Sequence, residues 1–216
     1  WDPSPCDRLN TIAVGCIAGP GAAGYSRAAG LPDDAFIHDG QMTKRIVRAA
    51  TISALAPLPD QYLWDLGAGC GSVAIEWLRA AQDVQGQGAH ATAIERDKSR
   101  SAMIAQNASR LGTPFLDIIT GEAETAIAEL DAPDAVFIGG GISGGRWLDT
   151  VWDRLTAGGR LVANVVTLEG ERALLDAHAT HGGELARIAI SHASPIGELS
   201  GWRPAMPVTQ WSVVKP

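Results

Sequence analysis

Two patterns of apolar residues alternate along the chain after residue 42. Short apolar runs predict buried strands, and longer segments with apolar residues at helical spacing predict helices. The predicted strands span residues 62–66, 90–94, 116–119, 135–138 and 160–166. Three of the predicted helices begin at Thr43, Ser72 and Lys98. Another ends near Leu130, another contains Trp147 and Trp152, and the last spans residues 168–181. Thr43 is the expected N-cap of the first helix.

Strand and helix alternate five times, which predicts an α/β fold with a mostly parallel sheet and helices on both faces. Two closing apolar runs, residues 185–193 and 208–214, predict an antiparallel addition at one edge and bring the sheet to seven strands. Between them we expect a loop, because the segment contains Pro195, Gly197, Gly201 and Pro204.

The first part of the chain has a different composition. Residues 1–35 are rich in Gly, Ala and Pro, with one strand-like run at residues 12–17. We expect a linker or the tail of a preceding domain there, and one domain over residues 36–216. The chain opens at Trp1 rather than at a methionine, so we expect it to be part of a longer protein.

Composition narrows the class of protein. The 216 residues are 46% hydrophobic, which suits one soluble domain with a sizeable core, and no apolar run reaches membrane-spanning length. A net charge of −7 argues against a nucleic-acid partner. Three cysteines without Cys-x-x-Cys spacing favour neither a disulfide framework nor a metal site, so a reducing cytoplasm is expected.

The first predicted strand runs into a glycine-rich turn, and a helix follows. The turn has the pattern Asp-x-Gly-x-Gly-x-Gly, which lacks the G-x-G-x-x-G spacing of dinucleotide-binding proteins. An acid before the first glycine would repel a pyrophosphate, but it suits the cationic amino-acid end of S-adenosylmethionine (SAM). The turn resembles that of class I SAM-dependent methyltransferases, although a tight turn in an α/β core would also use glycines. The resemblance implies cofactor contacts from Asp65, Gly67, Ala68, Gly69, Gly71 and Ser72.

The other strand ends meet at the same edge of a parallel sheet, where ligands of open α/β folds bind. Glu95, followed by Arg96, is positioned to accept both ribose hydroxyls, and Glu122 and Ala123 to meet the adenine. Gly139 lies where the sulfonium would come. The alternatives are ordinary helix-start acids: Glu95 would then be solvated, and Glu122 would be favoured by the helix dipole.

Two further segments complete the predicted site. Residues 40–44 precede the sheet and are expected to cover the cofactor, with Gln41 and Thr43 as ligands of its carboxylate unless Thr43 serves only as a cap. Gly140 and Gly141 would leave space for the methyl acceptor beside the sulfonium.

A more particular resemblance rests on five segments together. They are Gln41-Met42-Thr43-Lys44, Asp65-Leu66-Gly67-Ala68-Gly69-Cys70-Gly71-Ser72, Gly139-Gly140-Gly141, Pro195-Ile196-Gly197 and Pro207-Val208-Thr209-Gln210-Trp211. The combination resembles the decarboxylating C15-methyltransferases of cobalamin biosynthesis and the matching C-terminal half of precorrin-6Y C5,15-methyltransferases.

This family resemblance implies SAM as methyl donor, S-adenosylhomocysteine (SAH) as product, and a precorrin tetrapyrrole as substrate. Methyl transfer to C15 would be accompanied by decarboxylation of the C12 acetate. The resemblance also implies a homotetramer and, in the fused form, an N-terminal methyltransferase domain. Arg146 and Arg203 are candidate partners of the substrate carboxylates. No residue is assigned as the acid of the decarboxylation. The alternatives are an RNA methyltransferase of the tRNA adenine-N1 type and a SAM-binding domain without chemistry of its own.

Overall fold

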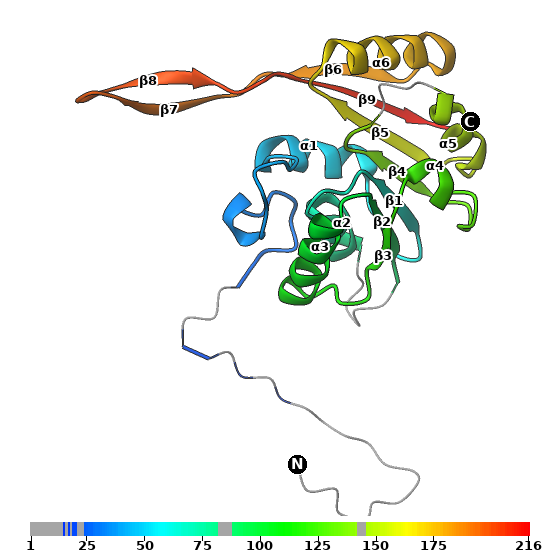
Figure 1. The fold of residues 1–216 in the computed structure, drawn as a ribbon, viewed down its shortest axis with the longest axis horizontal. Helices are drawn as coiled ribbons and strands as arrows, with labels where there is room; N and C mark the ends of the chain where they lie inside the picture. Colours follow the sequence, from blue (N-terminus) through cyan, green and yellow to red (C-terminus); the bar gives the residue numbers. More distant parts are fainter. Residues whose placement is uncertain (1–14, 16, 18, 21–23, 82–87, 142–145) are drawn as a thin grey trace, which may run out of the picture.

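A seven-stranded sheet forms the centre of the molecule, and the computed structural model describes residues 15, 17, 19–20, 24–81, 88–141 and 146–216 (Figure 1). The strand order is β3-β2-β1-β4-β5-β9-β6. The strands are β1 (Tyr62–Leu66), β2 (His90–Glu95), β3 (Asp117–Thr120), β4 (Ala135–Ile138), β5 (Arg160–Val165), β6 (Glu184–Ile188) and β9 (Val208–Val214). Strands β1 to β5 pair in parallel, and β9 runs antiparallel to both of its neighbours.

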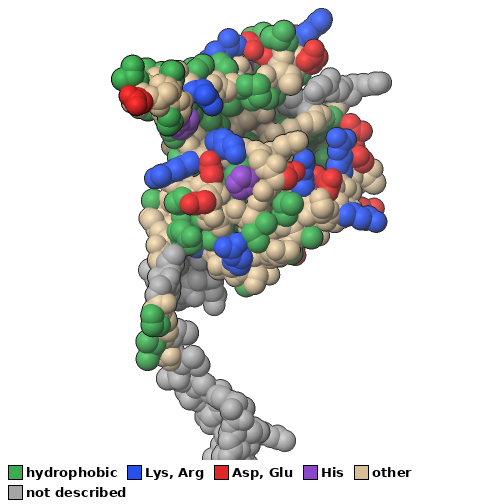
Figure 2. Space-filling view, turned by 60° about the vertical axis from the view of Figure 1, so that its left-hand side comes forward, with side chains coloured by type: hydrophobic (Ala, Val, Ile, Leu, Met, Phe, Trp, Pro, Cys, Tyr) green, Lys and Arg blue, Asp and Glu red, His purple; other side chains and the backbone are tan. Residues whose placement is uncertain are grey.

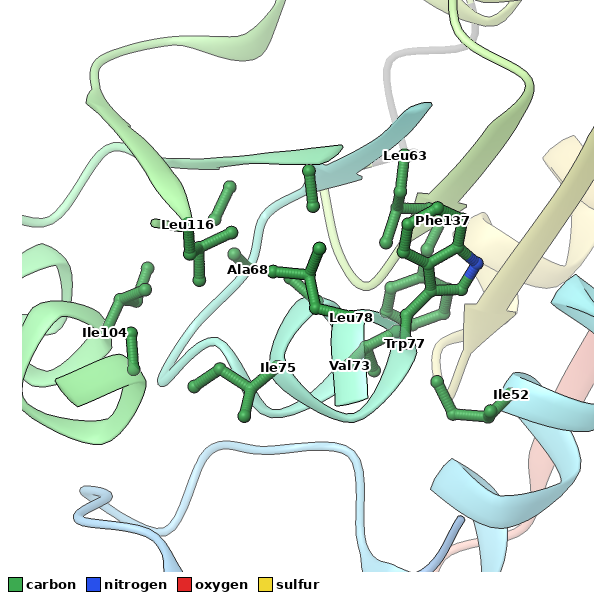
Figure 3. Close-up of a cluster of buried hydrophobic side chains, with 14 of the residues drawn as sticks. Ile52, Leu63, Ala68, Val73, Ile75, Trp77, Leu78, Ile104, Leu116 and Phe137 are labelled. Atoms are coloured by element: carbon green, nitrogen blue, oxygen red, sulfur yellow. The ribbon is translucent and has the colours of Figure 1, made fainter. Parts of the chain in front are cut away.

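Helices cover both faces of this sheet (Figure 1). One face carries α1 (Arg45–Leu55), α2 (Ser72–Ala81) and α3 (Lys98–Leu111), and the other carries α4 (Ala123–Ala126), α5 (Arg146–Arg154) and α6 (Leu168–His181). Each side has its own apolar cluster. Figure 3 shows the first one, where Trp77 and Leu78 of α2 point at Leu63 of β1 and Phe137 of β4. The predicted fold class is confirmed by this topology.

The second closing element departs from the prediction. Residues 185–193 do not form one strand: β6 ends at Ile188, which pairs with Val208, the first residue of β9. The residue before Val208 is Pro207, which has no N–H with which to extend a ladder. With no partner beyond Ile188, the chain leaves the sheet there.

The prediction of a loop after this point is also wrong. The segment forms a two-stranded hairpin of β7 (Ser191–Ile196) and β8 (Leu199–Pro204), closed by a turn in which Gly197 has a φ of 62°. A positive φ is what a two-residue hairpin turn requires. Prolines are tolerated because both strands of an isolated hairpin are edges. The hairpin projects from the carboxyl edge of the sheet, well away from the helical layers (Figure 1).

The segment before the first helix joins the core. Leu31, Ala35 and Phe36 are buried among the residues of the α1–α3 face, and Asp33–Ala35 form a short 3₁₀ turn. Four of the six residues of the strand-like run at residues 12–17 lie outside the described residues. Within the described part of the chain, no helix has the length and apolar character needed to cross a membrane.

Candidate functional site

The glycine-rich turn of residues 67–71, hereafter the Gly loop, joins β1 to α2. Gly67, Gly69 and Gly71 have φ values of 72°, 61° and 78°, a region that side chains disfavour. A Cβ on Gly71 would lie 2.8 Å from Cγ2 of Ile104, and one on Gly69 would lie 3.3 Å from the carbonyl oxygen of Gln41. The loop therefore needs glycine both for its backbone path and for the close approach of neighbouring segments. Ala68 and Ser72, also predicted to contact the cofactor, are buried beside it.

Asp65 is the next-to-last residue of β1, just before the Gly loop, and is fully buried. Its Oδ2 accepts a hydrogen bond from the backbone N–H of Ala74 at 3.0 Å, while Oδ1 has no hydrogen-bond partner among the described residues. Burial raises the pKa of this carboxyl to about 7, the Ala74 hydrogen bond opposes the shift, and the charge of Glu95 adds to it. An unpartnered buried carboxylate oxygen is rare in folded proteins.

Glu95 ends β2 and braces the Gly loop. Its Oε2 accepts from the N–H of Gly69 at 2.8 Å, and its Oε1 accepts from the N–H of Asp97 at 3.0 Å. The side chain is buried, whereas Arg96 beside it is exposed. The alternative, a solvated helix-start acid, is wrong for Glu95: its side chain is buried, and Asp97 caps α3.

The end of β3 lies next to Glu95. The N–H of Gly121 donates to the carbonyl oxygen of Glu95 at 3.1 Å, which places Glu122 and Ala123 beside the end of β2. Glu122 is exposed and occupies the N-cap position of α4, but its side chain makes no capping hydrogen bond.

Residues 37–43, hereafter the cover segment, pass over the Gly loop before α1 begins. The predicted N-cap, Thr43, is wrong by one residue: α1 starts at Arg45, and Lys44 holds the cap position without a side-chain bond. The backbone N–H of Arg45, the first residue of the helix, instead donates to Oδ1 of Asp33 at 2.9 Å. Gln41 lies with its carbonyl oxygen over Gly69, so the structure brings the cover segment and the Gly loop together.

The turn after β4 borders the Gly loop on its other side. Gly139, Gly140 and Gly141 are exposed, and a Cβ on Gly67 would lie 3.4 Å from the backbone nitrogen of Gly140. Of the two arginines predicted to meet substrate, Arg146 is the first residue of α5, and its side chain lies outside what the structure describes. Arg203 is exposed on β8 near the base of the hairpin, opposite His192.

Two residues that the sequence analysis did not single out hold the ends of the cover segment. Asn107 of α3 and Arg48 of α1 are both fully buried, and both bind its backbone. No local pattern marks them, since each resembles an ordinary polar residue on an amphipathic helix.

Comparison with known proteins identifies the family. Residues 34–215 match the model described as the precorrin methyltransferase domain. The chain belongs to the precorrin methyltransferase family. The matched range includes every residue of the sheet, the Gly loop and the hairpin.

Individual relatives agree with this membership. A precorrin-6Y C(5,15)-methyltransferase (decarboxylating) of Sinorhizobium is 50% identical over 207 residues, 96% of this chain and 49% of the relative. The chain thus spans about half the length of that relative. A cobalt-precorrin-6B C(15)-methyltransferase (decarboxylating) of Salmonella typhimurium is 36% identical over 82% of this chain and 92% of its own length.

A solved structure matches the precorrin methyltransferase fold of the chain. It is the C-terminal domain of precorrin-6Y C5,15-methyltransferase from Rhodobacter capsulatus, with 44% identity and a TM-score of 0.81. The match covers 88% of this chain and 100% of that structure.

Proposed function

We propose that this chain transfers a methyl group from SAM to C15 of a precorrin and removes the C12 acetate carboxyl as CO2, in cobalamin biosynthesis. The observation that carries the proposal is the Salmonella relative. It is matched over 92% of its length, and its name specifies a decarboxylating C15-methyltransferase. The activity thus belongs to a unit of this size.

The residues at the carboxyl edge fit SAM. The Gly loop offers bare main chain to a ligand, and the unpartnered Oδ1 of Asp65 suits a cationic amino group or a water bound to it. SAM supplies an already activated methyl group, so the chain mainly binds and aligns donor and acceptor. Cofactor binding by Asp65, Gly67, Ala68, Gly69, Gly71 and Ser72 is part of the proposal.

Glu95 is our ribose-binding residue. Each of its oxygens accepts one backbone N–H, and a carboxylate oxygen has a second lone pair with which to accept a ribose hydroxyl. Arg96, Glu122 and Ala123 would border the adenine. Gln41 and Thr43 would close over the amino-acid end from the cover segment.

The acceptor would lie beside the turn of Gly139, Gly140 and Gly141, where the lack of side chains leaves room for a flat macrocycle. Its carboxylates call for basic groups on a chain of net charge −7. Arg203 on the hairpin and Arg146 at the start of α5 would supply them. Figure 2 shows Lys and Arg side chains on the face beneath the hairpin.

The test is incubation of the chain with SAM and precorrin-6Y, or its C5-methylated form, followed by mass spectrometry. We expect a product that has gained one methyl group and lost one carboxyl group, and no product with a folded Gly69→Val control. Methyl gain without CO2 loss would contradict decarboxylation by this chain alone. Binding of SAM without turnover would favour a non-catalytic domain, and methylation of tRNA would favour the RNA methyltransferase alternative.

We also propose that the hairpin joins copies of this chain into a homotetramer. Four large apolar side chains are 66–78% exposed on it or just after it: Ile196, Leu199, Trp202 and Met206. Hydrophobic side chains are visible along it at the top of Figure 2. An isolated two-stranded hairpin is marginally stable in water, so a partner surface would stabilise it. In a full-length protein of the Sinorhizobium type, an N-terminal methyltransferase domain would be a further partner.

Light scattering after gel filtration tests the oligomer. We expect a tetramer for the parent chain and smaller species for Trp202→Ser. The matched control is Leu175→Ser, which changes a 51% exposed leucine on α6 and should leave the tetramer intact. A monomeric parent would contradict the proposal.

A further inference from the structure

Asn107 joins the cover segment to the Gly loop through one side chain. Its Oδ1 accepts from the N–H of Ile37 at 2.7 Å, and its Nδ2 donates to the carbonyl oxygens of Ile37 at 2.9 Å and Cys70 at 3.0 Å. The amide therefore pairs with both backbone groups of Ile37, as a neighbouring strand would. The same amide holds the carbonyl of a Gly-loop residue.

Arg48 holds the other end of the cover segment. Its Nη1 donates to the carbonyl oxygen of Thr43 at 2.5 Å, while its Nε donates to Glu76 at 2.6 Å. Glu76 also accepts from the N–H groups of Gly30 and Leu31. Arg48 and Glu76 are both buried, and the guanidinium also donates to Asp33 and to the carbonyl of Leu31, so several partners hold the group that binds Thr43.

The middle of the cover segment is held more weakly. Arg100 of α3 forms an ion pair with Asp39 at 2.8 Å, with both side chains partly exposed. Exposed ion pairs of this kind contribute little to stability. The distance between Gln41 and Gly69 therefore depends on the two ends of the cover segment, which the buried side chains of Asn107 and Arg48 hold.

We propose that Asn107 is a positioning residue for cofactor binding. It sets the spacing between the cover segment and the Gly loop before any ligand arrives, so that Gln41 and the Gly loop face the same ligand. The proposal rests on the proposed SAM site. It adds that binding is pre-organised from α3, by a residue that does not itself reach the ligand.

The variant that isolates this role is Asn107→Asp. It keeps the size of the side chain and the acceptor for the N–H of Ile37. It replaces the amide donor with an oxygen that faces two carbonyl oxygens. The matched control is Leu111→Ala on the same helix, a buried apolar truncation that should lower the melting temperature without touching the cover segment.

Calorimetric titration measures the affinity of both variants for SAH, and hydrogen exchange without ligand measures the protection of their backbone amides. We expect Asn107→Asp to weaken SAH binding at least about tenfold, because both hydrogen bonds donated by Nδ2 are lost. It should also speed exchange of the Ile37 amide, because the carbonyl of Ile37 is no longer held and the cover segment loosens. Leu111→Ala should change SAH affinity less than about twofold. Equal loss of affinity in the two variants would assign Asn107 a purely structural role.

A measurement on the parent chain keeps the proposal testable if Asn107→Asp does not fold. The Ile37 amide should already be protected from exchange without ligand, because its acceptor is a buried side chain. Exchange at the rate of a free loop would overturn the positioning role. A parent chain that protects Ile37 but does not bind SAH would instead contradict the proposed function.

Discussion

The buried carboxyl of Asp65 should make the stability of this protein fall as the pH rises. Burial raises its pKa from 3.8 to about 7, with a further increase from the charge of Glu95. Between these two values the folded chain holds a proton on Asp65 that the unfolded chain has released. Because the folded state binds more protons in this range, each increase in pH favours unfolding.

The magnitude follows from the two pKa values. One pH unit within the window changes the free energy of unfolding by at most about 1.4 kcal/mol, so the whole window is worth on the order of 4 kcal/mol. This stability is fully present below pH 3.8 and is lost once the pH has passed about 7. Asp65→Asn keeps an oxygen for the N–H of Ala74 and cannot ionise. It should match the parent near pH 4 and exceed it in stability at pH 8.

Urea unfolding of both proteins from pH 4 to pH 8 measures the difference. The control is Asp97→Asn, because hydrogen bonds from Ser99 and Arg100 lower the pKa of Asp97. Because the window of that carboxylate lies below pH 3.8, Asp97→Asn should leave the slope between pH 4 and 8 nearly unchanged. If Asp65→Asn keeps the parent's slope between pH 4 and 7, Asp65 is ionised in the folded chain and the reasoning fails.

Three further predictions concern ligands. Glu95→Ala should weaken SAH binding ten- to a hundredfold, by calorimetry, and lower the melting temperature by a few degrees, because the N–H of Gly69 loses its charged acceptor; the exposed Glu129→Ala is the control. Gly69→Val should abolish SAH binding in a chain that circular dichroism shows to be folded, since φ is 61° there and Gln41 is close. Arg203→Ala should raise the KM for precorrin up to about fivefold, as an exposed charge pair permits, and leave SAH affinity unchanged.

The position of the candidate site residues at one edge of the sheet could be predicted, because it follows directly from local pattern. Asp65, Glu95, Glu122 and Gly139 each come at the end of an apolar run, and parallel strands bring such ends to one edge. The glycine spacing then indicated where a ligand could approach. What local pattern left open was orientation, and Glu95 shows this: its position was predicted, but not its bonds to the Gly loop.

The remaining features depend on contacts between distant segments. Asn107 binds a residue 70 positions away, and a polar residue on a helix gives no sign of such a partner. The hairpin was missed for a different reason. Nearly all of β7 and β8 is exposed, so neither strand shows the alternation of apolar and polar residues that one-sided burial imposes. Only Gly197 at its turn offered a local indication.

The carboxyl of Asp65 links the stability of the fold to its proposed ligand. Asp65 is expensive to ionise because it is buried with one oxygen unpartnered, and a core position chosen for stability alone would be apolar. A cation bound at that oxygen would offset the cost of burying the ionised carboxylate. The free energy of ligand binding would then include the stability that the ligand-free chain lacks. Sites that violate the packing rules of a core are where function is expected. Asp65 violates these rules beside the Gly loop, and we therefore propose it as a functional residue.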